Sequence, residues 1–280
     1  MARTDRLKEL LDQLSSTVET LVTSEDWQAM LAVAGRFHRY NASNVMLILA
    51  QRPTATRVAG YKRWQSMGRQ VRKGERSIAI LAPCVYRRCS VDEREAETNP
   101  ALAKVLRGFT VAHVFDVEQT EGEPLPDVRP ELLDGAGVDG LWDGLAAQVG
   151  AAGFTLERGD CGGANGRTDY GARTVRVRDD VAPAQATKTL AHELGHVLLH
   201  DASRVSSGRE LAEVEAESVA YVVCQAVGLD TAGYSLPYVA HWSNGAAPLV
   251  RTTAERVVTA ARQILDGLGF ADPAAEEVAA

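Results

Sequence analysis

The hydrophobic positions over the first fifty residues recur with a helical period. Leucines and valines between residues 4 and 22 fall three or four positions apart, which predicts an amphipathic helix. Two further helices are predicted over 24–37 and 41–51, and Ser24, which is followed by two acids, is typical of a helix start. Pro53 would end the last of these helices because proline cannot continue one.

Further along the front half the pattern changes from helical to alternating. Apolar runs at 77–82 and 109–117 predict two strands of one sheet. The acidic stretch between them, 89–100, predicts a loop. Glycines and prolines are dense over 119–140, and this stretch therefore predicts a domain boundary.

The back half alternates between helical and strand-like patterns. The predicted elements are a helix over 141–149, strands over 154–158 and 170–178, and helices over 184–200, 210–225 and 249–268. With the front half they predict an α+β protein: a small helix-plus-antiparallel-sheet domain at 1–126, a linker at 127–140 and a second domain at 141–270. The last residues, 271–280, predict a disordered tail.

The composition fits a soluble protein of two domains. The chain has 280 residues, of which 45% are hydrophobic and 24% are charged. No apolar run approaches the roughly 20 residues that a membrane helix needs, so no membrane partner is expected. The amino-terminal residues lack the apolar centre of a signal peptide. The four cysteines show no C-x-x-C spacing and are expected to be reduced thiols of a cytoplasmic protein.

The net charge of −7 hides an asymmetry between the two halves. Residues 1–118 carry 18 lysines and arginines against 13 acids, a net of +5, whereas the remaining residues carry 12 against 24, a net of −12. Nine basic residues lie within 57–88, together with a single acid, Glu75. A basic front half and an acidic back half predict two modules with different partners, the first partner being polyanionic.

The basic segment, 57–88, has the composition of a surface that binds single-stranded nucleic acid. Its cations could follow the phosphates, and Tyr61 and Trp64 could stack on unpaired bases. The candidate contact residues are Tyr61, Lys62, Arg63, Trp64, Arg69, Arg72, Lys73 and Arg76. From composition alone, an ordinary solvated basic surface with Trp64 in the core explains the segment equally well.

The strongest chemical signal is the motif His192-Glu193-Leu194-Gly195-His196. On a helix, two histidines four residues apart lie one turn apart on the same face, so both imidazoles can bind one ion. Glu193 lies beside them and can take a proton from a metal-bound water. A chance match on an apolar helix is disfavoured, because half of the six histidines fall within residues 190–200. The motif predicts a Zn²⁺ site with Glu193 as general base.

The third ligand is expected from the acidic helix predicted over 210–225. Glu213 and Glu217 are four residues apart and share a face with small residues, which allow a close approach of the histidine helix. We expect Glu213 to bind the ion and Glu217 to orient a ligating imidazole as a hydrogen-bond acceptor. Glu215 points to another side of the helix and is the alternative ligand. A solvated acidic helix without any ligand is the remaining alternative.

Three further residues near the motif are ambiguous. His200 shares the face of the two histidines but lies two turns from His192, about 12 Å along the axis, which is too far to join the same ion. It is expected to line the helix end or to contact a bound molecule. Tyr234 and Tyr238 could donate an oxyanion hydrogen bond opposite Glu193, although aromatic residues in such a segment are more often packing residues.

Residues from about 25 to 126 resemble the N-terminal domain of the ArdC antirestriction proteins, which is associated with binding single-stranded DNA. The matching stretches are Tyr40-Asn41-Ala42-Ser43-Asn44, Gly60-Tyr61-Lys62-Arg63-Trp64, Gly68-Arg69-Gln70-Val71-Arg72-Lys73-Gly74-Glu75, Ile80-Leu81-Ala82-Pro83 and Val114-Phe115-Asp116-Val117-Glu118-Gln119-Thr120. The resemblance implies that the basic segment binds DNA, and it adds Asn44 to the candidate contact residues. The acidic stretch 89–100 is less typical of the family.

Residues from about 140 to 245 resemble an ImmA/IrrE-type zincin, which is similar to the metallopeptidase half of ArdC-like proteins. The stretches 192–196 and 213–217 match the family patterns H-E-x-x-H and E-x-x-A-[DEN]. The resemblance implies a gluzincin-like zinc-peptidase domain joined to a DNA-binding domain, of the kind that mobile genetic elements such as plasmids and phages carry. It does not establish proteolysis, because some relatives use this scaffold for regulation.

Together these patterns predict a cytoplasmic, ArdC-like zinc metallopeptidase that binds single-stranded DNA and hydrolyses a protein or peptide substrate. The rival hypothesis is a non-catalytic antirestriction or regulatory protein that shields DNA and holds the metal structurally. An open fourth coordination position beside Glu193 favours the enzyme, whereas a closed shell of four protein ligands favours the rival.

Overall fold

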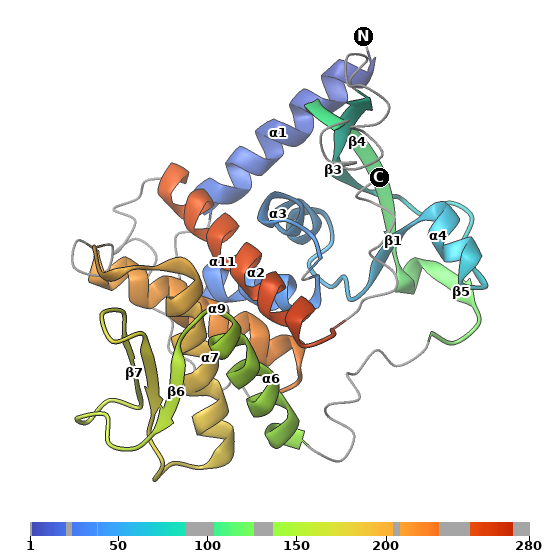
Figure 1. Ribbon diagram of the computed structural model, residues 1–280. Helices are drawn as coiled ribbons and strands as arrows, with labels where there is room; N and C mark the ends of the chain where they lie inside the picture. Colours follow the sequence, from blue (N-terminus) through green and yellow to red (C-terminus); the bar gives the residue numbers. More distant parts are fainter. Residues whose placement is uncertain are drawn as a thin grey trace. The chain divides into compact units, whose positions relative to one another are not determined.

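The computed structural model describes residues 2–20, 24–37, 39–87, 104–125, 137–203, 208–229 and 247–270. They form two compact units, which are described separately (Figure 1). Of the described residues, those of 2–17 and 46–125 belong to the first unit, and those of 18–45 and 137–270 belong to the second. The predicted α+β class is confirmed, since both units combine helices with antiparallel strands.

The first unit is built around a three-stranded antiparallel sheet in the order β1-β4-β3. Its elements are most of α1 (Ala2–Thr20), the end of α3 (Ala42–Gln51), β1 (Val58–Gly60), α4 (Tyr61–Ser66), β2 (Arg69–Val71), β3 (Ile78–Arg87), β4 (Lys104–Asp116), the short 3₁₀ turn η2 (Val117–Gln119) and β5 (Thr120–Gly122). Val58 lies opposite Asp116, and Ile78 lies opposite Val114, so β4 is the central strand. The strands β2 and β5 form a separate antiparallel pair.

The core of this unit contains the indole of Trp64. Its ring is fully buried, and its N–H donates to the backbone carbonyl of Phe115 over 2.8 Å. Met67, Val71 and Leu125 pack against the cluster that Trp64 forms with Ala59 of β1. The short helix α4, which the hydrophobic pattern did not predict, thus fastens the β1–β4 edge of the sheet.

The second unit combines helices with a small sheet. Its elements are α2 (Ser24–Arg36), α6 (Gly137–Ala151), β6 (Thr155–Arg158), β7 (Gly166–Asp169), β8 (Thr174–Val177), α7 (Pro183–Leu199), α9 (Arg209–Ala226) and α11 (Ala247–Gly267). The strand order is β6-β8-β7, with β6 parallel and β7 antiparallel to β8. The sequence predicted strands on either side of the glycine-rich stretch 159–166, but the end of that stretch itself begins β7.

Helix α7 begins with Pro183, whose missing N–H costs nothing in the first turn. One face of α7 buries Leu190 and Leu194 completely. Gly195 lies where α7 crosses α9, and a Cβ there would be only 3.2 Å from the Cα of Ala216. The two helices therefore approach each other closely along the side that carries the predicted ligands.

Helix α2 packs in the second unit, although the sequence placed it in the front domain, 1–126. The indole N–H of Trp27 donates to the hydroxyl of Ser218 on α9 over 3.0 Å, and both side chains are fully buried. Gly35 approaches the backbone carbonyl of Val222 on the same helix. Helical periodicity indicates which face of α2 is apolar but not which partner covers it. The limits of the functional domains stay a prediction.

Among the described residues, no helix combines the length and the apolarity needed to cross a bilayer. Cys84, Cys161 and Cys224 are free thiols. The predicted loop at 89–100 and the predicted tail at 271–280 lie outside the described residues, as do Tyr234 and Tyr238.

Candidate metal centre

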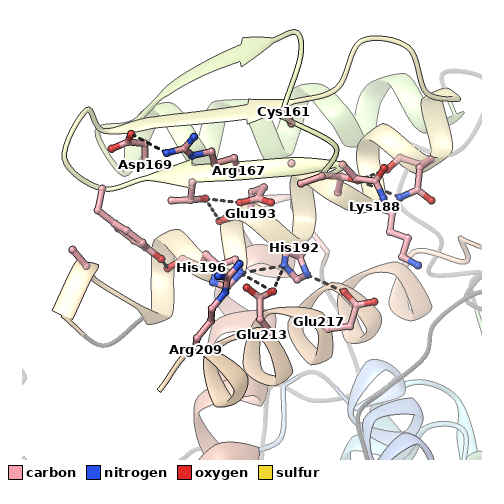
Figure 2. A pocket seen from close by; sticks show the side chains of 18 of the residues that line it. Cys161, Arg167, Asp169, Lys188, His192, Glu193, His196, Arg209, Glu213 and Glu217 are labelled. Carbon is pink, nitrogen blue, oxygen red and sulfur yellow. Dashed lines mark hydrogen bonds and ion pairs between the residues drawn. The ribbon is translucent and has the colours of Figure 1, made fainter. Parts of the chain in front are cut away.

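Three side chains from α7 and α9 converge on one point. The Nε2 atoms of His192 and His196 are 3.1 Å apart. One carboxylate oxygen of Glu213 lies 3.4 Å from the first of these nitrogens and 3.5 Å from the second. Figure 2 shows the three groups facing one another at the floor of a cleft. The sequence expected these residues as ligands, and the fold brings their ligand atoms together.

The triangle of ligand atoms has the dimensions of a metal site. Nitrogen and oxygen ligands about 2.0–2.2 Å from a tetrahedral zinc ion are separated from one another by about 3.3–3.6 Å. The observed sides of 3.1, 3.4 and 3.5 Å are close to this range. Among the described residues, His192, His196 and Glu213 form the group of His, Cys, Asp or Glu side chains whose ligand atoms lie close enough together to hold an ion. The donor set therefore fits a divalent cation.

The outer nitrogen of each imidazole is also engaged. Nδ1 of His192 lies 2.8 Å from a carboxylate oxygen of Glu217, and because a carboxylate only accepts, the imidazole donates. Nδ1 of His196 lies 3.0 Å from Nδ1 of His200, which ends α7 as its C-cap. When Nδ1 of His192 donates to Glu217 and the second ring proton is lost, the Nε2 lone pair faces the ligand triangle.

The residues of the trio shift one another's pKa values. Burial alone would lower the pKa of His192, but hydrogen bonds to Glu213 and Glu217 outweigh it and raise this pKa to about 10. The neighbouring imidazoles of His192 and His196 hold the pKa of Glu213 well below its usual range. These two shifts correspond to an ion pair between His192 and Glu213.

Glu193 lies beside the trio in a different environment. Its side chain is only 5% exposed, and burial raises its pKa against the opposing effect of His192. The hydroxyl of Thr168 on β7 donates to one of its carboxylate oxygens over 2.6 Å. A Cβ on Gly166 would lie 2.5 Å from the other oxygen, so only glycine leaves room for the carboxylate there. Strand β7 thus fixes Glu193 at the edge of the cleft.

The cleft above these residues has a volume of about 1120 Å³. Tyr170, at the end of β7, lines it and donates from its hydroxyl to the backbone carbonyl of His196 over 3.3 Å. Burial and the charge of Glu193 raise the pKa of Tyr170 to about 12, so the phenol remains a donor. Figure 2 shows Arg209 extending from α9 towards His196 and Glu213. The cleft is large enough for a segment of peptide and contains two hydrogen-bond donors near the trio.

Glu215, the alternative ligand of the sequence analysis, lies away from the trio. Its side chain is fully buried and contacts Nε2 of His200 at 2.8 Å and the guanidinium of Arg256 at 2.8 Å. The geometry therefore favours Glu213 over Glu215 as the third ligand, while Glu217 lies where the sequence expected an orienting acceptor.

The residues expected to contact DNA fall into distinct groups, and all of them except Asn44 lie in the first unit. Trp64 is buried, as described above, so its ring has no accessible face for the stacking role predicted for it. Asn44 is also buried, with 4% of its surface exposed, and its backbone N–H donates to the side chain of Asn41. Neither residue offers a surface to nucleic acid.

Two of the predicted arginines are held by backbone carbonyls. The guanidinium of Arg69 donates to both oxygens of Thr120 and to the carbonyl of Glu123. Arg72 donates to the carbonyl of Glu118 and pairs with Glu75. These two cations fasten β2 to the chain around β5.

The other candidate contact residues are accessible. Tyr61 is 43% exposed, with its ring edge against Phe115. Lys62, Lys73 and Arg76 are exposed, and Arg63 is partly exposed. An aromatic ring and several cations therefore remain available on the surface of the first unit.

Comparison with known proteins finds a match for each part of the chain. The N-terminal domain of the anti-restriction factor ArdC matches residues 4–115, and an IrrE N-terminal-like domain matches residues 153–225. The chain thus joins a region similar to the ArdC N-terminal domain to a region similar to the IrrE N-terminal-like domain. The predicted resemblance to both families is confirmed.

An uncharacterized protein of Bacillus anthracis is 25% identical over 277 residues, which cover 85% of this chain and 47% of the relative. The chain thus spans about half the length of that relative. Two crystal structures of the antirestriction ArdC protein from the R388 plasmid are also similar. The metal-free one is 19% identical, covers 82% of each chain and has a TM-score of 0.49. The Mn(II)-bound one is 20% identical, covers 86% of this chain and 96% of that chain, and has a TM-score of 0.48.

The IrrE-like match runs from the turn before β6 to the end of α9 and includes all three residues of the trio. Five residues around the trio were missed by the sequence analysis: Gly166, Thr168, Tyr170, Arg209 and Arg256. Gly166 and Thr168 lie outside the two strands predicted at 154–158 and 170–178, and their position against Glu193 depends on strand pairing between distant segments. Arg209 lies one helical turn before Glu213, a spacing that could have pointed to it.

Proposed function

We propose that this ArdC-like chain is an antirestriction protein whose first unit binds single-stranded DNA and whose second unit is a zinc-dependent peptidase. The observation that supports the peptidase part is the trio of His192, His196 and Glu213 beside a buried Glu193 in an open cleft. Three protein ligands are typical of catalytic zinc sites, where water or substrate takes the fourth position. A cytoplasmic location is part of the same proposal.

Zinc is the proposed ion because two imidazoles and one carboxylate are a common donor set of catalytic zinc. One of the two crystal structures of the R388 ArdC protein is Mn(II)-bound, and manganese is the alternative for this site. Metal analysis of the purified protein separates the two.

In the proposed reaction, the bound ion supplies Lewis acidity that polarises the substrate carbonyl and acidifies water. The carboxylate of Glu193 takes the proton from the attacking water and then delivers it to the leaving amine. Thr168 holds one of its oxygens, so the carboxylate keeps a fixed orientation. Arg209 can donate hydrogen bonds to the negative charge that develops on the carbonyl oxygen, and Tyr170 would have to release the backbone carbonyl of His196 before it could do the same.

The metal site is tested by Glu213→Gln. We expect the purified chain to bind one zinc ion and the variant to lose at least a hundredfold in affinity, because the amide removes the anionic ligand. Glu210→Gln on the same helix is the matched control and should bind zinc as the parent does. Zinc competition with a chelating dye measures both. Equal affinity of parent and Glu213→Gln contradicts the assignment of this ligand.

The affinity for zinc is also expected to depend on pH. Because the pKa of His192 is raised to about 10 in the metal-free trio, this imidazole carries a proton below that pH and must lose it to bind the ion. Affinity therefore rises with pH by about tenfold per unit between pH 6.5 and 8.5. Dye competition at several pH values gives the slope, and a slope of zero would show that no proton is displaced.

The DNA-binding part is tested on the accessible residues. Lys73→Ala should weaken binding to a labelled single-stranded oligonucleotide and reduce the salt slope by about 0.7, and Tyr61→Ala should cost about 1–3 kcal/mol of stacking. Lys8→Ala, an exposed lysine of α1, is the control. If both variants of the basic segment bind like the control, this surface does not contact DNA.

A further inference from the structure

A chain of four polar residues connects α11 to the candidate metal ligand His196. The guanidinium of Arg256 on α11 donates to Glu215 over 2.8 Å, Glu215 contacts Nε2 of His200 at 2.8 Å, and Nδ1 of His200 contacts Nδ1 of His196 at 3.0 Å. The side chains of His200 and Glu215 are fully buried. Figure 1 shows α11 beside α9 within the second unit.

With His200 in its neutral form, the two ends of this chain set the direction of each hydrogen bond. A guanidinium only donates and a carboxylate only accepts, so the Nε2–H of His200 must donate to Glu215. A neutral imidazole that donates from Nε2 accepts at Nδ1, and His196 therefore donates from its own Nδ1. Its remaining lone pair is then on Nε2, the atom that faces His192 and Glu213.

Arg256 also holds the backbone of the helix that carries the ligands. Its second nitrogen donates to the carbonyl of Leu199 over 2.6 Å, at the end of α7, where carbonyls have no partner within the helix. One guanidinium thus positions both Glu215 on α9 and the last turn of α7. Any displacement of Arg256 would move His200 and Glu215 with respect to each other.

We propose that Arg256 is a positioning residue of the metal centre, which holds His196 in its metal-binding tautomer through Glu215 and His200. The proposal rests on the proposed metal site, and it makes α11 a required part of that site. Helix α11 lies outside the segment that matches the IrrE-like domain, residues 153–225. A protein truncated after residue 225 would therefore retain the three ligands but lose Arg256, which orients His196.

The tautomer can be measured directly in the metal-free full-length protein. Long-range ¹H–¹⁵N spectra at pH 8 should show the proton of His196 on Nδ1 and none on Nε2. This measurement needs no variant and no bound metal, so it tests the proposal even if the zinc site itself fails. A proton on Nε2 of His196 in the parent protein overturns the proposal.

The contribution of Arg256 to metal binding is tested by Arg256→Met, with zinc as the probe. We expect a 10- to 100-fold loss of affinity, the range typical of outer hydrogen-bond partners of metal ligands. The matched control is Arg262→Met, which removes an exposed ion pair with Asp266 on the same helix and should change affinity less than twofold. A folded Arg256→Met protein that binds zinc like the control overturns the proposal.

A double variant distinguishes positioning from general loosening of the unit. His200→Phe removes the acceptor of His196, so its effect and that of Arg256→Met should not add if both act through the same imidazole. Additive losses would show that Arg256 acts by another route and would overturn the proposal. Should Arg256→Met not fold, Arg256→Lys keeps a donor to Glu215 and should lose less zinc affinity than His200→Phe; a loss as large as that of His200→Phe overturns the proposal.

Discussion

Glu193→Gln is expected to abolish peptide hydrolysis while zinc content and folding stay unchanged. The amide occupies the same space between Thr168 and Gly166 but cannot take a proton from water. General-base catalysis contributes about 10²–10⁴-fold to the rate, so residual turnover should fall at least a hundredfold. Cleavage of a random peptide library by the zinc-loaded protein, followed by mass spectrometry, gives the measurement.

Two controls make this result specific. Glu157→Gln alters an exposed carboxylate on β6 that pairs with Arg176 and should cleave like the parent. Metal analysis of Glu193→Gln should show unchanged zinc, because Glu193 is not one of the three converging ligands. If the parent protein cleaves no peptide, yet protects plasmid DNA from restriction equally well with and without the Glu193 carboxylate, the non-catalytic rival is correct.

The histidine pair could be placed from the sequence because its geometry is local. Four residues on a helix always return to the same face, and the same rule placed Glu213 opposite Glu215 on α9. Small residues on that face allowed the close crossing of the two helices. The helical periodicity does not indicate which distant strand covers Glu193. Thr168 lies next to Glu193 because of strand pairing in the sheet.

The hydrophobic pattern also does not predict which buried polar side chains contact one another. His200 was expected at the helix end, and it lies there, but its partners Glu215 and Arg256 come from two other helices. A charged residue in an amphipathic helix is usually exposed, and nothing in the local sequence distinguishes Arg256 from the exposed Arg262. Only packing of α11 on α9 selects one of them.

The basic segment illustrates a different limit. A tryptophan among cations fits a stacking platform and a buried anchor equally well, because its ring is apolar and its N–H needs one acceptor. The carbonyl of Phe115, which is 51 positions away in the chain, decides for burial of Trp64. Tyr61, three residues earlier, keeps an exposed ring, so the hypothesis of base stacking moves to that residue.

Trp27→Ala is expected to destabilise the second unit by about 3–5 kcal/mol, the usual cost of removing a large buried ring. The ring lies in α2, far from the metal site in sequence, but it packs on α9 and donates to Ser218, the residue after Glu217. Its loss would leave a cavity and an unpaired buried hydroxyl against the helix that carries Glu213. Zinc affinity should fall along with stability, because the ligand helix loses its support.

Hydrogen–deuterium exchange of the full-length protein measures the expected loss of stability at the amides of α9. Trp27→Ala should speed exchange of the amides of α9, whereas Trp142→Ala, a partly exposed ring of α6 beneath Arg158, should leave α9 protected. Trp27→Phe keeps most of the ring and should show an intermediate effect. Unchanged exchange in α9 for Trp27→Ala would mean that the metal unit folds without α2. Faster exchange would make α2, a segment of the ArdC N-terminal match, part of the metal-binding fold.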